Sequence, residues 1–207
     1  MGEVKGMDTG LASTIAPSDM TNNADMHVLN LIQQGTGSWN RIGRKVYNKS
    51  IRLTGQLNAN WNILAVGSVL AVWTRIVIVW DSQPAGTLPT KGDILGSTSQ
   101  AGVEGSNIYD HLRYDNMDRF RILKDEVRIL DMSSVAQTTG GNVQKSEAFD
   151  IFINLNNAET LYSGQSNPLT IGDISSGALY CIFLNDLNPG GNVSMSNNII
   201  TRLRYTD

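Results

Sequence analysis

The chain has 207 residues, of which 41% are hydrophobic and 17% are charged, and its formal net charge is −3. This length corresponds to one domain of ordinary to large size, and the low charge excludes a highly charged disordered chain. The 20 glycines show no three-residue period, which excludes a collagen-like chain. Asn, Gly, Ser and Thr are abundant, whereas Lys and Glu are scarce. Many turn formers and few helix formers predict an all-β protein.

Charge is unevenly distributed along the chain. Residues 1–25 carry a formal charge of −3, residues 26–80 carry +6 with no carboxylate, and residues 81–207 carry −6. The carboxylate-free segment is long enough to produce a positive local field, which can attract an anion whatever the total charge is.

The single cysteine, Cys181, excludes an intramolecular disulfide and a multi-cysteine zinc site. It lies in an apolar run and is expected to be a small core residue. The apolar stretches at residues 63–73 and 76–80 are shorter than the roughly 18 to 20 residues of a membrane span, so we expect no membrane insertion. The N-terminus lacks a basic region followed by an apolar core, so we expect no secretory signal.

Residues 1–33 are expected to form a partly flexible N-terminal arm, with a short turn of helix or an edge segment at 26–34. Residues 34–207 are expected to form one domain, because apolar and polar residues alternate along most of it. The predicted strands cover residues 45–57, 63–80, 147–155, 177–184 and 199–205, with turns or loops at 58–62, 133–145 and 185–198.

Two short alternating runs follow each other within residues 118–131. Phe120 and Ile122 alternate with Arg119 and Arg121, and Val127 and Ile129 alternate with Arg128. Apolar positions that repeat at two predict a hairpin with its turn at 124–125 or 125–126, and a helix is the alternative. The count then reaches about eight strands with no long helix. It predicts an eight-stranded antiparallel jelly-roll β-sandwich.

The sequence shows no constellation of catalytic or metal-binding residues. His27 and His111 have no partner at metal-ligand spacing. Asp110, Asp115 and Asp118 could bind calcium, but they lack the ordered oxygen ladder of a dedicated calcium loop. Nucleophile-elbow, P-loop and dinucleotide-binding motifs are missing too. We therefore expect no enzymatic activity, no cofactor and no required metal.

The most distinctive charged feature is the segment at residues 39–52, which holds five bases, two aromatic residues and no acid. Cations can release counterions from a phosphate backbone, and an exposed aromatic ring can stack on a base. On an unbroken strand, Lys45 and Lys49 share one face and Arg44 and Arg52 share the other. The alternative is a solvated face whose lysines discourage edge pairing. The predicted nucleic-acid-binding residues are Arg41, Arg44, Lys45, Lys49, Arg52, Trp39 and Tyr47.

Several stretches carry a family resemblance in their order along the chain. They are QGTG at 34–37, NRIGRK at 40–45, KSI at 49–51, RIVIVWDSQP at 75–84 and DRFRILKD at 118–125. In this order they resemble the capsid proteins of circular, Rep-encoding single-stranded DNA (CRESS-DNA) viruses, over residues 33 to 130. The motifs are degenerate singly and moderately specific together.

The resemblance implies a coat subunit that assembles as a 60-copy (T=1) icosahedral shell around a circular single-stranded DNA genome. It implies location in the virion, with assembly in the host cell and the nucleus as the expected compartment. Members of the family usually begin with an Arg-rich arm, whereas residues 1–25 here contain one base, Lys5. This departure concerns DNA binding more than shell formation. Low charge also suits a subunit that buries much of its surface against copies of itself.

Two other classes of function remain open. A carbohydrate-binding, lectin-like β-sandwich would use the tryptophans Trp39, Trp61, Trp73 and Trp80 as stacking platforms. An enzyme on the same scaffold, such as a cupin, needs clustered metal-binding histidines, and the two isolated histidines argue against it. The sequence does not identify a host receptor.

Overall fold

A computed structural model describes residues 3–15, 25–63, 71–96, 108–131, 141–186 and 193–207. It confirms the all-β prediction. Short helical turns are α1 (Lys91–Ile94), η1 (Tyr114–Asn116) and η2 (Ile171–Asp173). The strands are β1 (Lys5–Ile15), β2 (Met26–Val28), β3 (Lys45–Ile63), β4 (Ala71–Asp81), β5 (Phe120–Asp131), β6 (Gly141–Tyr162), β7 (Ile174–Ser176), β8 (Ala178–Asn185) and β9 (Val193–Thr206).

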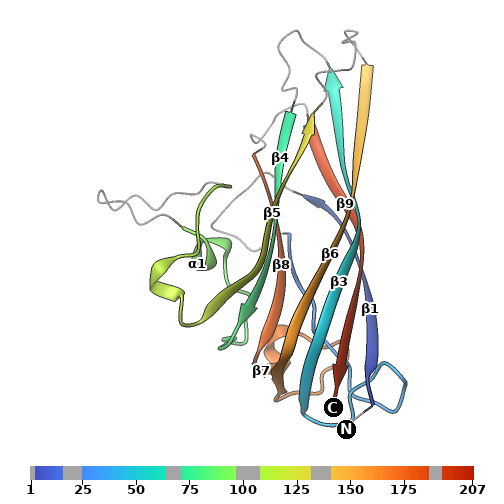
Figure 1. The fold of residues 1–207 in the computed structure, drawn as a ribbon, viewed down its shortest axis with the longest axis vertical. Coiled ribbons are helices and arrows are strands. Elements are labelled where there is room, and N and C mark those ends of the chain that lie inside the picture. The colour runs from blue at the N-terminus through green and yellow to red at the C-terminus, as the bar shows by residue number, and fades with distance from the viewer. Residues whose placement is uncertain (1–2, 16–24, 64–70, 97–107, 132–140, 187–192) are drawn as a thin grey trace.

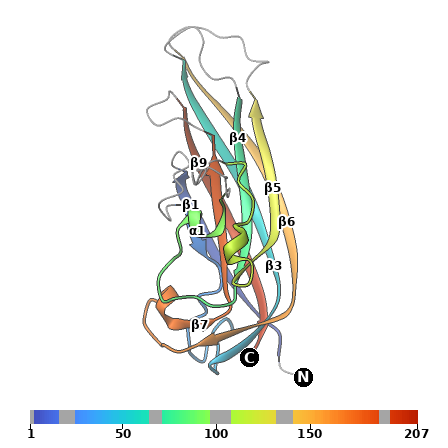
Figure 2. The same ribbon diagram turned by 90° about the vertical axis from the view of Figure 1, so that its left-hand side faces the viewer.

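The strands form two antiparallel sheets packed face to face (Figures 1 and 2). The first sheet has the order β1-β9-β3-β6-β7, and the second has the order β2-β8-β4-β5. Apart from the short β7, the sheets interleave eight strands in the order of a jelly roll, and this confirms the predicted fold class. Both termini lie at one end of the sandwich because β1 begins beside the end of β9 (Figure 1).

The inner faces of the two sheets supply the core. Residues of β8 are buried along its whole length, and those of β4 nearly so, as their continuous apolar runs predict. The first sheet covers one face of these strands, and parts of the 82–119 connection, including α1, cover the other. Cys181 lies in β8 with no exposed surface, which confirms it as a core residue.

The segment predicted to be a hairpin at 118–131 is instead one continuous strand, β5. Its register against β4 shifts where Ile78 pairs with Lys124 and Val79 pairs with Ile122, leaving Leu123 as an extra residue. Such a bulge reverses the alternation of faces beyond it. The change of parity that the sequence shows therefore marks a bulge, and both apolar runs lie on the outer face of the second sheet.

Strands of the first sheet are longer than predicted. Residues 58–62 were expected to be a turn, but they continue β3, whose end pairs with the beginnings of β6 and β9. These polar segments form strands because they pair with one another, and the Ser146 hydroxyl donates to Asn58 Oδ1 at 2.6 Å. Residues 141–145 and 193–198 were likewise predicted to be loop, but they belong to β6 and β9. The parts of these predicted loops at 133–140 and 187–192 lie outside the described residues.

The N-terminal boundary at residue 33 is wrong, because β1 and β2 belong to the sandwich. β1 pairs with β9 from Lys5↔Tyr205 to Ile15↔Met195, and β2 pairs with β8. Met7, Leu11 and Ile15 of β1 are buried. Small and polar residues between them hide this pattern in the sequence. Residues 16–24 lie outside the part that the structure describes.

Candidate nucleic-acid and assembly surfaces

A bulge in β3 decides which of the predicted nucleic-acid-binding residues share a face. The register of β3 against β9 shifts between Asn48 and Ser50, so Lys49 is an extra residue relative to β9. Lys45 and Arg52 are consequently both exposed on the outer face of the first sheet. The predicted separation of Lys45 and Arg52 onto opposite faces is wrong.

Most cations on this face are already paired with carboxylates from neighbouring strands. On this face, within the part of the chain that the structure describes, Lys49 and Arg204 have no carboxylate within ion-pair distance. The face therefore combines a few free cations with several neutralised ones. The pairs are Lys45–Glu159 at 2.9 Å, Arg52–Asp150 through Nε and Nη2 of the guanidinium, and Arg202–Asp8 at 2.6 Å.

Each of the two arginine–carboxylate pairs stabilises the ionised forms of both partners. The hydrogen bonds from Arg202 keep the pKa of Asp8 below its ordinary value, and those from Arg52 do the same for the pKa of Asp150. The carboxylates in turn raise the pKa of both arginines. All four groups are therefore ionised at neutral pH, and their charges cancel in pairs. The attraction of this face for a polyanion is correspondingly small.

Arg41 was predicted to contact nucleic acid, but its side chain is completely buried. Its guanidinium donates to the carbonyl oxygens of Ile32 at 2.9 Å, Gly43 at 2.7 Å and Gly164 at 3.0 Å. It also lies 4.1 Å from the centre of the Tyr162 ring, and burial lowers its pKa. Arg41 therefore joins three loop segments at the base of the sandwich, and the prediction for this residue is wrong.

The other two predicted residues on this segment remain exposed. Arg44 donates from Nε to the carbonyl oxygen of Tyr162 at 3.1 Å and keeps its remaining nitrogens near solvent. The Tyr47 ring lies on the surface, with the Lys45 ammonium 5.6 Å from its centre. Contact of Arg44 and Tyr47 with nucleic acid stays a prediction.

Trp39 lies on a tightly bonded loop between Gln33 and Arg41, and 48% of its surface is exposed. The Arg41 amide donates to the Gln33 carbonyl at 3.1 Å, and the Gly35 amide donates to the Arg41 carbonyl at 3.0 Å. The hydroxyl of Tyr205 donates to the Trp39 carbonyl at 2.5 Å. Hydrogen bonds within the loop and from Tyr205 thus fix its backbone, so the indole is attached to a rigid segment.

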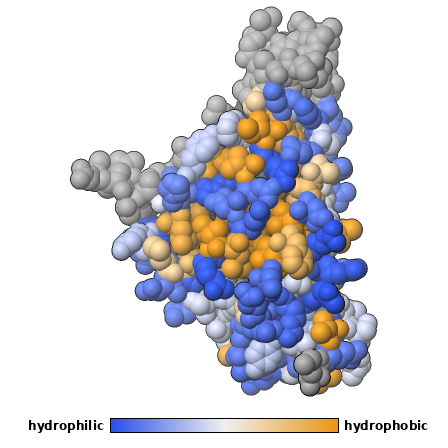
Figure 3. Space-filling model, in the orientation of Figure 1, coloured by the Kyte–Doolittle hydropathy of each residue, from blue (hydrophilic) through white to orange (hydrophobic). Residues whose placement is uncertain are grey.

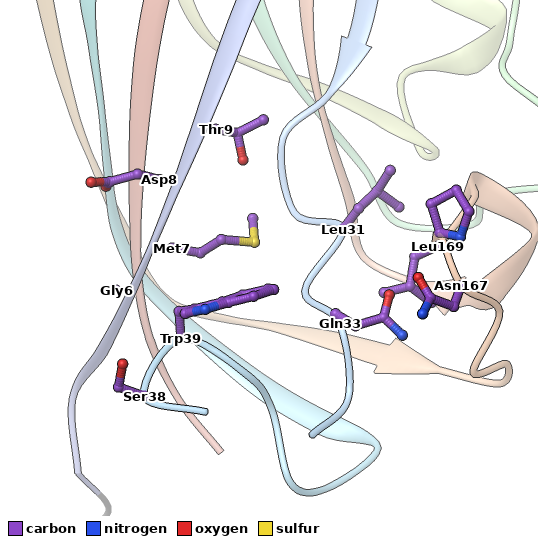
Figure 4. A pocket seen from close by; sticks show the side chains of 11 residues that line it. Gly6, Met7, Asp8, Thr9, Leu31, Gln33, Ser38, Trp39, Asn167 and Leu169 are labelled. Atoms are coloured by element: carbon purple, nitrogen blue, oxygen red, sulfur yellow. The ribbon is translucent and has the colours of Figure 1, made fainter. Parts of the chain in front are cut away.

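A cavity of about 610 Å³ opens beside Trp39, between β1 and the segments at 31–39 and 167–169 (Figure 4). The indole extends beneath Met7 toward Leu31, while Gln33 and Asn167 lie on the opposite side. Its lining residues are Gly6, Met7, Asp8, Thr9, Leu31, Gln33, Ser38, Trp39, Asn167, Pro168 and Leu169. Sequence reasoning found Trp39 but not the cavity, because its walls come from three distant segments.

The Asp173 carboxylate fixes the wall of this cavity that carries Asn167. It accepts hydrogen bonds from the Thr170 amide at 2.8 Å and the Ser166 hydroxyl at 2.8 Å. These bonds, the one from Thr170 first, lower the pKa of Asp173. Its stabilising contribution is therefore present above an unfolded-state pKa of about 4 and is lost as the pH falls through the lower folded-state pKa.

We expect the Asp173→Asn variant to unfold more easily than wild type at pH 7, and this deficit to shrink as the pH falls from about 5 toward 3. Urea denaturation of both proteins across this range measures the difference. A deficit of the same size at every pH would mean that the carboxylate charge plays no part.

Apolar side chains remain uncovered on the outer face of the second sheet, between charged neighbours (Figure 3). Val127 and Ile129 of β5 pair with Arg75 and Trp73 of β4. The Trp73 ring meets the Tyr109 ring edge-on, with 6.1 Å between their centres. We call Trp73, Tyr109, Val127 and Ile129 the β4–β5 apolar patch; their exposed fractions run from 37% to 53%.

A lectin-like module would use four tryptophans to stack on sugar rings, but two of them are too buried to contact a sugar. Trp61 and Trp80 are buried in the core, at 1% and 9% exposure. Trp39, on the 33–41 loop, and Trp73, on β4, are surface residues that lie on different parts of the molecule.

Groups of three or more metal-ligating side chains are not found among the described residues. Burial raises the pKa of the Cys181 thiol, which makes it unreactive. In the same part of the chain, no helix has the length and apolar character needed to cross a membrane.

Comparisons with known proteins give weak structural likenesses. No family model and no curated relative matches the chain. The solved structures include that of infectious bursal disease virus Gt strain, with 11% identity and a TM-score of 0.24, covering 99% of this chain and 37% of that one. They also include VP1 of Trichodysplasia spinulosa-associated polyomavirus in complex with 3′-sialyllactose, with 8% identity and a TM-score of 0.20, covering 98% and 94%. Both structures come from viruses. This chain spans little more than a third of the bursal disease virus chain, and its jelly-roll assignment rests on its own strand order.

Proposed function

We propose that the chain is a viral coat subunit that self-assembles into a small icosahedral shell around a circular single-stranded DNA genome. Jelly rolls occur in viral capsids, in lectins and in cupins. The coat interpretation is supported by the ordered motifs at 34–51, 75–84 and 118–125 that resemble CRESS-DNA virus capsid proteins. In this proposal the protein is located in the virion, assembly takes place in the host nucleus, and 60 copies close the shell.

The β4–β5 apolar patch is the observation that carries this proposal. Monomeric proteins rarely leave large contiguous apolar patches uncovered, and aromatic residues are enriched in protein interfaces. Trp73 and Tyr109 contribute two aromatic rings to the patch, and Val127 and Ile129 extend it along β5. A patch on one face that meets a different surface of the next copy makes a heterologous contact, which closes into a shell under symmetry.

Sedimentation velocity of the full chain across salt and pH tests the proposal. Species in the megadalton range support a shell. A monomer or dimer under all conditions would contradict it, and would favour a lectin-like module.

Genome contact is proposed for the outer face of the first sheet, with a small electrostatic component. Lys49 and Arg204 supply the free charges, and Arg44 and Tyr47 are exposed nearby in sequence. Two neutralised phosphates predict that the log–log dependence of single-strand affinity on salt has a slope of about −1.4. This is far below the slope of an Arg-rich arm.

We expect the Lys49→Ala/Arg204→Ala variant to reduce that slope toward zero, because it removes the two cations of this face that have no carboxylate partner. The matched control is Arg52→Ala/Asp150→Ala, which removes a complete ion pair and should leave the slope unchanged. Fluorescence anisotropy with a thymidine oligonucleotide at several salt concentrations measures both. Equal slopes for wild type and the Lys49/Arg204 variant would exclude this face as the contact.

A further inference from the structure

We propose that the cavity beside Trp39 is a binding site for a neutral saccharide. Its volume of about 610 Å³ lies within the usual range of ligand pockets, roughly 300–1,000 Å³. This size suits a mono- or disaccharide. The inference is independent of shell formation; on a coat subunit, such a site would attach the particle to surface glycans.

The first support is a preorganised aromatic platform. The Trp39 backbone is held by the Tyr205 hydroxyl, and the loop behind it is held by the buried Arg41. The indole is nonetheless half exposed, and it extends into the cavity (Figure 4). A rigid, exposed ring offers a large contact area at little cost in conformational entropy. The apolar C–H face of a pyranose ring matches such a surface.

Neutral hydrogen-bonding groups surround this platform. Gln33 lines the cavity and donates from Nε2 to the Ser166 carbonyl at 3.2 Å, which leaves its side-chain oxygen able to accept a hydrogen bond. Asn167 is exposed, with both ends of its amide open to a ligand. Thr9 and Ser38 add hydroxyl groups to the lining. Amides and hydroxyls can pair with the edge hydroxyls of a sugar in either direction.

The charge of the cavity decides between a sugar and a nucleotide. Its described lining contains no Lys, Arg or His. The single charged residue, Asp8, points away from the cavity and is paired with Arg202 (Figure 4). A phosphate-bearing ligand would find no cation there, and single-strand binding depends on cations along the backbone. A neutral polyhydroxylated ring needs none.

Ligand-observed saturation-transfer NMR on the full chain tests the proposal. The probes are methyl β-galactoside, methyl α-glucoside, methyl α-mannoside, N-acetylglucosamine and lactose, each at millimolar concentration. At least one should bind, and Trp39→Ala should weaken its affinity about tenfold or more. Trp39→Phe should retain part of the binding. The matched control is Tyr114→Ala, which removes an exposed aromatic ring that lies outside both the cavity and the β4–β5 apolar patch and should leave binding unchanged.

Two outcomes would overturn the proposal. One is that no sugar in the panel gives saturation transfer that depends on Trp39, in variants whose thermal unfolding matches wild type. The other is that a thymidine hexanucleotide binds and loses its affinity in Trp39→Ala while the sugars do not. That result would assign the platform to base stacking.

Discussion

Replacing Arg41 with alanine is expected to lower the free energy of unfolding by about 3–5 kcal/mol. The guanidinium satisfies carbonyl oxygens of Ile32, Gly43 and Gly164. Its removal leaves the buried Ile32 acceptor without this donor, breaks two partly buried hydrogen bonds and opens a cavity against Tyr162. Lysine should not rescue the loss, because one ammonium cannot reproduce the planar fork that reaches three separate carbonyls.

Urea denaturation followed by tryptophan fluorescence measures this effect. Arg44→Ala is the matched control and should cost less than about 1 kcal/mol, because Arg44 is exposed and makes one backbone hydrogen bond. An Arg41→Ala variant as stable as wild type, but with weaker DNA binding, would restore Arg41 to the nucleic-acid surface and contradict the structural role.

The Val127→Asp/Ile129→Asp variant is expected to abolish particle formation while the subunit stays folded. A carboxylate buried without a partner in an interface costs several kcal/mol, and this cost recurs in every copy of a closed shell. The subunit itself should lose little stability, since Val127 and Ile129 are 43% and 45% exposed in the single chain.

Light scattering and circular dichroism, measured on the same sample, separate assembly from folding in this variant. The control Gln165→Asp adds a charge at an exposed loop position away from the apolar patch and should still assemble. If Val127→Asp/Ile129→Asp forms particles as readily as wild type, the β4–β5 apolar patch is not an interface.

The sandwich could be predicted from sequence where strands are strongly patterned. The unbroken apolar runs of β4 and β8 predict strands covered on both faces, and both are buried in this way. The two bulges could not be predicted from the sequence. An extra residue at Leu123 or Lys49 reverses which side chains face the core, but it leaves the local composition unchanged. One bulge was interpreted as a hairpin turn, and the other was missed.

Predictions for individual site residues were wrong where the contacts of the side chain come from distant parts of the chain. Arg41 and Arg52 look alike in a basic segment, but one is enclosed by Gly164 and Tyr162 and the other meets Asp150. No spacing rule connects these positions. One local signal did indicate an ordered loop at 34–40. Its sequence, QGTGSWN, has closely spaced Gly and Asn residues, which favour tight turns.

Negative-stain electron microscopy of the purified full chain, with native mass measured on the same sample, tests shell formation most directly. We expect closed particles of one diameter, with a mass equal to 60 copies of the 22.6 kDa chain. Monomers, dimers or open aggregates at every salt concentration and pH, with no closed particles, would contradict it.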